Sequence, residues 1–210
     1  MLKFDPVKKH LYTWNGKPVV SVTQLFSRIA TRKEDSAPWT SISGVEFITS
    51  DIPGIFGQEF HKIPEIMLNG DVPDYDPIFK PYVNSLNMFF AAHPYLLSDK
   101  TVKVVECMLY SVKYGYAGTL DFLILVEDTY GRLWLIDWKT GAIQEHHKWQ
   151  LAAYDQLAVE NFKLSKWPYT MTVRIIENKM PQLQIRKPYE AKTDFNMFLS
   201  FLNVYNCKGK

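Results

Sequence analysis

Two short segments of the sequence carry residue types and spacings that suit metal-assisted chemistry: Gly118-Thr-Leu-Asp121 and Asp137-Trp-Lys139. Both lie in apolar runs rich in Val, Ile, Leu and Trp, which favour β-strands, and successive side chains of a strand point to opposite faces. Asp137 and Lys139 are therefore expected on one face. In an antiparallel hairpin with the connection 127–131, Asp121 lies opposite Asp137, with the two Cβ atoms about 5 Å apart. A two-residue slip in register would keep both carboxylates on that face.

Two facing carboxylates repel each other, and burial among apolar side chains increases the cost. A shared proton, a neighbouring cation or a bound divalent metal can relieve it, and Lys139 supplies only one positive charge. Oxygen-rich sites with few protein ligands suit Mg²⁺ or Mn²⁺. Such an ion polarises a phosphoryl oxygen and lowers the pKa of a bound water. Lys139 can orient or help to deprotonate that water, or stabilise charge on the phosphate.

The trio therefore predicts hydrolysis of a phosphodiester. The structural alternative is a solvent-facing Asp–Lys pair on an edge strand, with Asp121 an unrelated charge. An isolated Asp-x-Lys is common in proteins, and it is the second aspartate in register that favours the functional interpretation. Conflicts such as facing carboxylates are expected at functional sites, where other interactions compensate them.

The composition is that of an ordinary globular protein, and it excludes several kinds of site. The chain has 210 residues, 47% hydrophobic and 22% charged, with a formal net charge of +2, so any nucleic-acid surface must be local. No apolar run approaches about 18 residues, and no secretory signal is visible. Cys107 and Cys207 are too few for a disulfide scaffold, a four-cysteine zinc site or an iron–sulfur cluster. We expect an intracellular, cytoplasmic protein without a membrane partner.

The elements that must hold these residues alternate between helices and strands. Asn15-Gly16 between two short apolar runs predicts a hairpin over 10–22, and Ser21–Gln24 resembles a capping box that opens a short helix to Ile29. Pro64 is expected to kink the helix at 55–68 or to divide it. The other expected elements are a loop-rich stretch at 31–54, helices at 78–92, 145–162 and 191–205, strands at 102–113, 117–126 and 132–139, and a hairpin of 169–177 with 182–187.

This order of elements predicts an α/β fold with a mixed central β-sheet flanked by helices. We expect one domain over 1–210. It would consist of an N-terminal hairpin, helix and loop embellishment at 1–54, a catalytic core at 55–187 and a C-terminal helix at 188–210. No Gly-x-x-x-x-Gly-Lys phosphate loop is present, so neither a nucleotide cofactor nor a helicase motor is expected. The absence of a base-reading module argues against a sequence-specific restriction enzyme.

Several motifs, in the same order along the chain, resemble one family. Gly118-Thr-Leu-Asp121, Asp137-Trp-Lys139-Thr140 and Gln150-x-x-x-Tyr154 closely resemble the RecB-type branch of the PD-(D/E)XK nuclease superfamily. Gly57-Gln-Glu-Phe-His61 fits the Gly-x-x-x-His motif of that branch. The segment Tyr12–Thr23 resembles one in phage-encoded members and in the mitochondrial genome maintenance exonuclease. The resemblance covers residues 10–160 and implies a restriction-endonuclease-like core.

The resemblance also implies a role for each motif residue. Asp121 and Asp137 bind the metal, the main-chain carbonyl of Trp138 adds a ligand, and His61 completes the shell through an imidazole nitrogen. Lys139 is the catalytic lysine. Without the resemblance, His61 on an apolar helix is more often a packed, hydrogen-bonded histidine.

The roles of five further residues stay open between alternatives. Glu106 supports the metal ligands from behind, binds a second metal, or is a paired strand charge. Gln150 and Tyr154 lie four residues apart and hence on one helical face, where they contact DNA, brace the site or simply pack. Thr140 joins the expected DNA-binding residues, and Lys148 does so through a phosphate contact unless it only belongs to an amphipathic helix. The adjacent His146 and His147 are expected to splay apart and make a poor metal pair.

The leading functional hypothesis is a Mg²⁺- or Mn²⁺-dependent DNA exonuclease that acts at ends of single-stranded or duplex DNA. The resemblance implies phage-type recombination, replication or repair as its setting, with the host cytoplasm as its location if the chain is phage-encoded. A single-strand annealing protein or a helicase is the implied partner class, and an oligomer is compatible with the family. The alternatives are a structure-directed DNA endonuclease and a DNA-binding protein of the same fold that has lost catalysis.

Overall fold

A computed structural model describes residues 2–5, 11–30, 39–42, 45–48, 52–97, 102–125 and 132–208. Within these residues one eight-stranded sheet has the order β1-β2-β3-β7-β8-β9-β10, and β6 also pairs with β7. The strands are β1 (Leu2–Asp5), β2 (Leu11–Trp14), β3 (Lys17–Ser21), β6 (Val102–Ser111), β7 (Tyr116–Leu125), β8 (Trp134–Lys139), β9 (Tyr169–Ile176) and β10 (Lys179–Arg186). The sheet is mixed, because β3–β7 and β8–β9 are parallel pairs and the other pairs are antiparallel.

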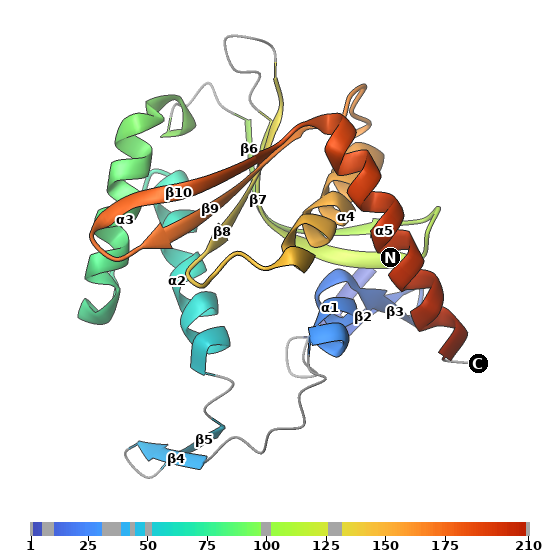
Figure 1. The fold of residues 1–210 in the computed structure, drawn as a ribbon, viewed down its shortest axis with the longest axis horizontal. Helices are drawn as coiled ribbons and strands as arrows, with labels where there is room; N and C mark the ends of the chain where they lie inside the picture. The colour runs from blue at the N-terminus through green and yellow to red at the C-terminus, as the bar shows by residue number, and fades with distance from the viewer. Residues whose placement is uncertain are drawn as a thin grey trace.

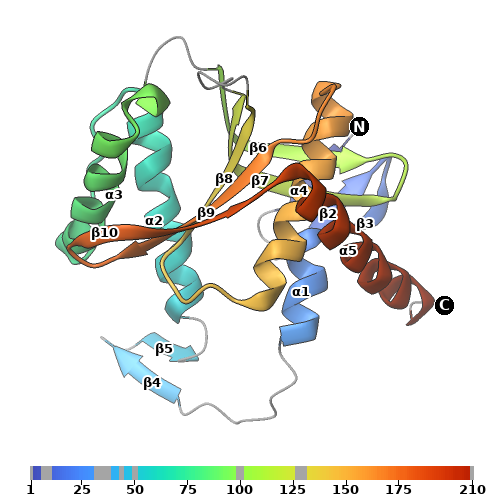
Figure 2. The same cartoon turned by 45° about the horizontal axis from the view of Figure 1, so that its top comes forward.

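Helices cover both faces of the sheet, which confirms the predicted fold class. Figures 1 and 2 show α2 and α3 on one side of β8–β10, and α4 and α5 on the other. The helices are α1 (Val22–Ala30), α2 (Ile52–Leu68), α3 (Lys80–Ala92), α4 (Glu145–Phe162) and α5 (Pro188–Lys208), with 3-10 turns η1 (Pro77–Phe79) and η2 (Pro94–Leu97). Among the helices described, none is long and apolar enough to cross a membrane.

Each face of the sheet has its own hydrophobic core. The first core joins Leu109, Tyr116, Leu120 and Leu135 of the sheet to residues of α1, α4 and α5. The second joins Trp134, Ile136 and Trp138 of β8, together with residues of β9, to α2 and α3. Alternate residues of β8 therefore enter different cores, and the strand is buried on both sides.

The turn and the capping box predicted near the N-terminus are both present. Asn15 and Gly16 have φ angles of 49° and 78°, the two positive values that a tight primed turn needs between β2 and β3. The amide of Gln24 donates to Ser21 Oγ at 3.0 Å, and the amide of Ser21 donates to Gln24 Oε1 at 3.4 Å, so the capping box opens α1.

The largest departures from the predicted elements lie between 31 and 68. The stretch at 31–54 was expected to be loop-rich, but it contains a two-stranded sheet of β4 (Trp39–Ile42) and β5 (Val45–Ile48) and the first residues of α2. Of the two outcomes predicted for Pro64, a kink or a division of the helix, the division is wrong, because α2 runs through Pro64 as one helix. Phe60 and Ile63 are buried on the apolar face of α2, and this packing offsets the one backbone hydrogen bond that proline removes.

Most of the remaining helices and strands follow the predicted boundaries, but α5 extends three residues beyond the predicted 191–205 at each end, and β1 was not predicted. Helix α4 has the predicted bounds, and the strands of the central hairpin begin and end within two residues of them. Strand β10 begins three residues earlier than predicted, because the turn at Glu177-Asn178, where Asn178 has a φ of 53°, is shorter than expected. The predicted connection at 127–131 lies outside the described residues.

The buried Asp155 on α4 is expected to lower the stability of the folded protein. Asp155 is 0% exposed, and neither of its carboxylate oxygens has a hydrogen-bond partner among the described residues. Burial raises the pKa of Asp155 well above its ordinary value. The unfolded chain releases this proton near pH 3.9 whereas the folded chain keeps it, so the penalty is absent below about pH 3.9 and grows as pH rises toward the folded pKa.

We expect Asp155→Leu to stabilise the protein by about 1–3 kcal/mol at pH 7.5, and by less at pH 5. Thermal unfolding should show a Tm several degrees higher for the variant, with the gap narrowing at the lower pH. The exposed Asp74→Leu is the control and should leave the Tm nearly unchanged at both pH values. A destabilised Asp155→Leu protein at pH 7.5 would show that the carboxyl group has a stabilising role.

Candidate active site

The backbone pairs the two strands that carry the motif aspartates. Strands β7 and β8 pair antiparallel, with Phe122 opposite Ile136. This register agrees with the one predicted from the sequence, in which Asp121 and Asp137 would form the next pair after Phe122 and Ile136. The side chain of Asp121 lies outside the described residues, so its position rests on the backbone alone.

Glu106 lies on β6, the neighbour of β7 on its other edge. In the β6–β7 ladder Val105 pairs with Phe122 and Cys107 pairs with Leu120, so Glu106 falls opposite Asp121. The side chain of Glu106 also lies outside the described residues. Three neighbouring strands, β6, β7 and β8, thus each carry one acidic residue near the end of the β7–β8 ladder.

Asp137 and Lys139 form a buried ion pair on β8. Asp137 is 3% exposed, and Lys139 Nζ donates to its Oδ1 at 2.8 Å. The alternation of β8 puts Trp138 on the opposite face, where its ring packs edge-on against Phe89 of α3. Only the main chain of Trp138 is therefore left to face the site, as the predicted role of its carbonyl requires.

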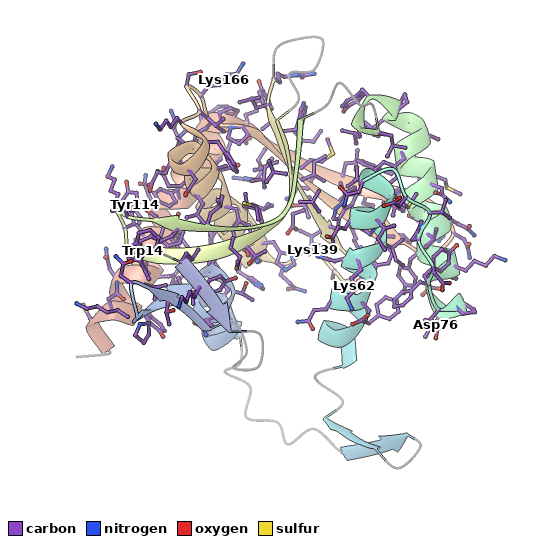
Figure 3. All side chains as sticks on the ribbon, turned by 180° about the vertical axis from the view of Figure 1, so that it is seen from behind. Trp14, Lys62, Asp76, Tyr114, Lys139 and Lys166 are labelled. Atoms are coloured by element: carbon purple, nitrogen blue, oxygen red, sulfur yellow. The ribbon has the colours of Figure 1, made fainter. Side chains whose placement is uncertain are left out.

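Helix α2 brings the Gly-x-x-x-His motif to the end of β8. A Cβ atom added to Gly57 would lie 3.7 Å from Thr140 Oγ1, so the helix backbone passes close to the residue that follows Lys139. His61, half-buried, lies one turn further along the same face of α2. Figure 3 labels Lys139 at the end of β8 and Lys62 on α2.

Gln150 and Tyr154 connect three of the motifs. Gln150 Nε2 donates to Tyr154 Oη at 3.1 Å, and Thr23 Oγ1 lies 3.4 Å from the same oxygen. The Tyr154 ring is 4% exposed and packs against Gly118, where an added Cβ would come within 2.7 Å of Cε1. Of the roles considered for this pair, the contacts favour bracing the site over touching DNA.

The N-terminal motif packs on the same strand. Tyr12 Oη and Thr119 Oγ1 share a hydrogen bond of 2.6 Å, so β2 is tied to the segment that leads into Asp121. Strand β7 pairs with β3 at Tyr116 and Ala117 and with β8 from Phe122 onward. The segment Gly118–Asp121 thus lies where one edge of β7 passes from β3 to β8.

The two histidines in the first turn of α4 do not splay apart as predicted, because their rings meet edge to face with the centroids 4.6 Å apart. His147 Nδ1 accepts a hydrogen bond from the amide of Gln144 at 3.1 Å and so caps the helix, while His146 stacks on Phe26. Burial, and then the charges of Lys139 and His146, lower the pKa of His147 to about 3. A neutral imidazole therefore stands near Lys139, a neighbour that the sequence did not indicate.

The other α4 candidates have surface and core contacts. Lys148 forms an ion pair with Glu145, and its ammonium lies 5.6 Å from the centroid of the Trp149 ring. Trp149 stacks near Phe26 and packs against the core beneath α4. Lys148 remains within reach of solvent, as a phosphate-binding lysine must be.

Arg174 is a further charged residue of this face that the motifs did not indicate. It lies on β9 as the register partner of Lys139, one strand away. The signal in the sequence is an arginine within the apolar strand YTMTVRII. Its proximity to Lys139 depends on the parallel pairing of β8 with β9, which no local pattern specifies.

Comparison with known proteins gives a weak structural likeness. No family model and no curated protein sequence matches the chain. Among solved structures, LHK-Exo in complex with dAMP is similar over 89% of both chains, with 11% sequence identity and a TM-score of 0.35. A likeness at this level does not establish a family, and the case for a function rests on the residues of the chain itself.

Proposed function

We propose that this chain is a metal-dependent DNA nuclease related to the RecB-type branch of the PD-(D/E)XK superfamily, and that it hydrolyses phosphodiesters at DNA ends. The observation that carries the proposal is the buried Asp137, paired with Lys139 at 2.8 Å, on a strand whose neighbours β7 and β6 carry Asp121 and Glu106. A buried carboxylate with further acidic residues on the adjacent strands needs positive charge to balance it, and one lysine supplies less than three carboxylates require.

The donor set fits a hard divalent cation. Asp121, Asp137 and the carbonyl of Trp138 would supply oxygen ligands, and His61 would add a nitrogen from α2. Such sites suit Mg²⁺ or Mn²⁺, which keep waters and accept phosphate oxygens as further ligands. When bound, the cation polarises the phosphoryl group and makes a bound water more acidic. Among the described side chains alone, no three His, Cys, Asp or Glu groups gather as a metal cage, so this assignment needs Asp121.

Lys139 has the chemistry of the catalytic lysine. The ion pair with Asp137 orients its ammonium on the carboxylate-bearing face. From there it can orient the attacking water or stabilise charge on the phosphate oxygens as the bond to phosphorus forms. His147, neutral at pH 7, adds no second full charge that would compete for the phosphate.

The first test is a substrate panel with and without metal. Purified protein is incubated with end-labelled single-stranded DNA, linear duplex and closed circular duplex in Mg²⁺, in Mn²⁺ and in EDTA. We expect loss of linear DNA in either metal and none in EDTA, with closed circles intact. Replenishing Mg²⁺ after EDTA should restore cleavage, which separates metal removal from irreversible unfolding.

Cutting of closed circles would move the proposal to a structure-directed endonuclease that uses the same residues. DNA binding without cleavage in either metal would favour a binding protein of this fold. Protein that neither binds nor cleaves DNA would refute the proposal.

A further inference from the structure

Arg174 shares a face and a level of the sheet with Lys139. Strands β8 and β9 are parallel and in register, with Asp137 opposite Thr172 and Lys139 opposite Arg174. The intervening Val173 enters the core formed with α2 and α3, so Thr172 and Arg174 are on the other face, with Asp137 and Lys139. Neighbouring strands lie about 4.8 Å apart, which puts the Arg174 backbone next to that of the proposed catalytic lysine.

Among the described residues, the guanidinium of Arg174 has no carboxylate partner. Its Nη1 donates to the neutral Gln182 Oε1 at 3.1 Å, and its Nε is buried without a hydrogen-bond partner among the described residues. Arg186 on β10 differs, because its guanidinium forms an ion pair of 2.5 Å with Asp194. An arginine stays charged at any pH a protein tolerates, and partly buried charges are normally paired with an opposite charge. The guanidinium of Arg174 thus suits an anion supplied by a ligand.

We infer that Arg174 binds a backbone phosphate of the substrate DNA, next to the phosphate that Lys139 faces. This inference rests on the proposed function. A guanidinium presents its donors in a planar fork that matches phosphate oxygens, and Gln182 holds that fork from one side. The contact reads no base, so it fixes the position of the strand without selecting a sequence.

Binding in EDTA tests the inference without requiring cleavage. Fluorescence anisotropy measures the affinity of wild type, Arg174→Gln and Arg174→Lys for labelled single-stranded DNA over a salt series. We expect Arg174→Gln to weaken binding about tenfold and to reduce the slope of log affinity against log salt by about one phosphate contact. Arg174→Lys, which keeps the charge and loses the fork, should fall between the two. The exposed Lys179→Gln, on the β9–β10 hairpin, is the charge-matched control and should bind as wild type does.

Thermal unfolding separates binding from folding. Since the described partner of Arg174 is a neutral amide, Arg174→Gln should not lower the Tm. The deficit should also be equal with circular single-stranded DNA and with linear DNA bearing a 5′-phosphate or a 5′-hydroxyl. Unchanged affinity and salt slope for Arg174→Gln would overturn the inference, and a deficit confined to phosphorylated ends would overturn the assignment to a backbone phosphate. Wild-type protein that fails to bind DNA would refute the proposed function as well.

Discussion

Lys139→Ala is expected to lower the rate of DNA cleavage in Mg²⁺ by about 10²–10⁴-fold, the range typical for loss of a group that moves a proton or stabilises charge in the transition state. DNA binding measured in EDTA should change much less, because one phosphate contact is a small part of the electrostatic binding energy. Single-turnover cleavage with excess protein measures the chemical step apart from product release. A variant that cleaves within tenfold of the wild-type rate would show that Lys139 is not catalytic.

Lys139→Ala should also lower the free energy of unfolding, and the exposed ion pair of Lys62 with Glu59 provides the comparison. Lys139 and Lys62 both bind a carboxylate, at 2.8 Å and 2.7 Å, but their side chains are 19% and 60% exposed. Loss of the exposed Lys62–Glu59 pair should cost less than about 0.5 kcal/mol. Loss of Lys139 leaves the buried Asp137 without its ion pair and should cost clearly more. Added Mg²⁺ should restore part of that loss if the cation binds Asp137 in the folded state.

Much of the site could be predicted because its geometry is local. The pairing of β7 with β8 follows from apolar alternation and from the hairpin that joins them, and its register, with Phe122 opposite Ile136, is the predicted one. The helical spacing of Gln150 and Tyr154 likewise predicts a shared face, and the two side chains form a hydrogen bond of 3.1 Å.

Contacts between distant segments could not be predicted in this way. Arg174 reaches the side of Lys139 through a parallel pair whose strands are separated by the whole of α4. The approach of Gly57 to Thr140 depends on how α2 is placed across the end of β8. These placements are set by the packing of two cores, which the sequence specifies only through many small contributions.

Gly118→Ala is expected to destabilise the protein by about 1–3 kcal/mol, because the added methyl group overpacks the contact between β7 and α4. Its Cβ would lie 2.7 Å from Tyr154 Cε1 and 3.2 Å from Leu157 Cδ1, and both side chains are buried. The Tyr154 ring cannot withdraw cheaply, because its hydroxyl accepts from Gln150 and lies near Thr23. Thermal unfolding should show a Tm lower by several degrees.

Two further variants make this prediction specific to the contact. Gly141→Ala is the matched control: nothing lies within 4 Å of its added Cβ, so its Tm should be unchanged or slightly higher. In a Tyr154→Ala background, where the ring is gone, Gly118→Ala should cost much less than it does in wild type, since residues in contact are not additive. If Gly118→Ala lowers the stability equally in wild type and in Tyr154→Ala, the Tyr154 ring is not the reason that position 118 requires glycine. A reduced cost would show that Gly118 is required because the Tyr154 ring packs against its backbone. This contact would then fix the position of α4 relative to the strand that carries Asp121.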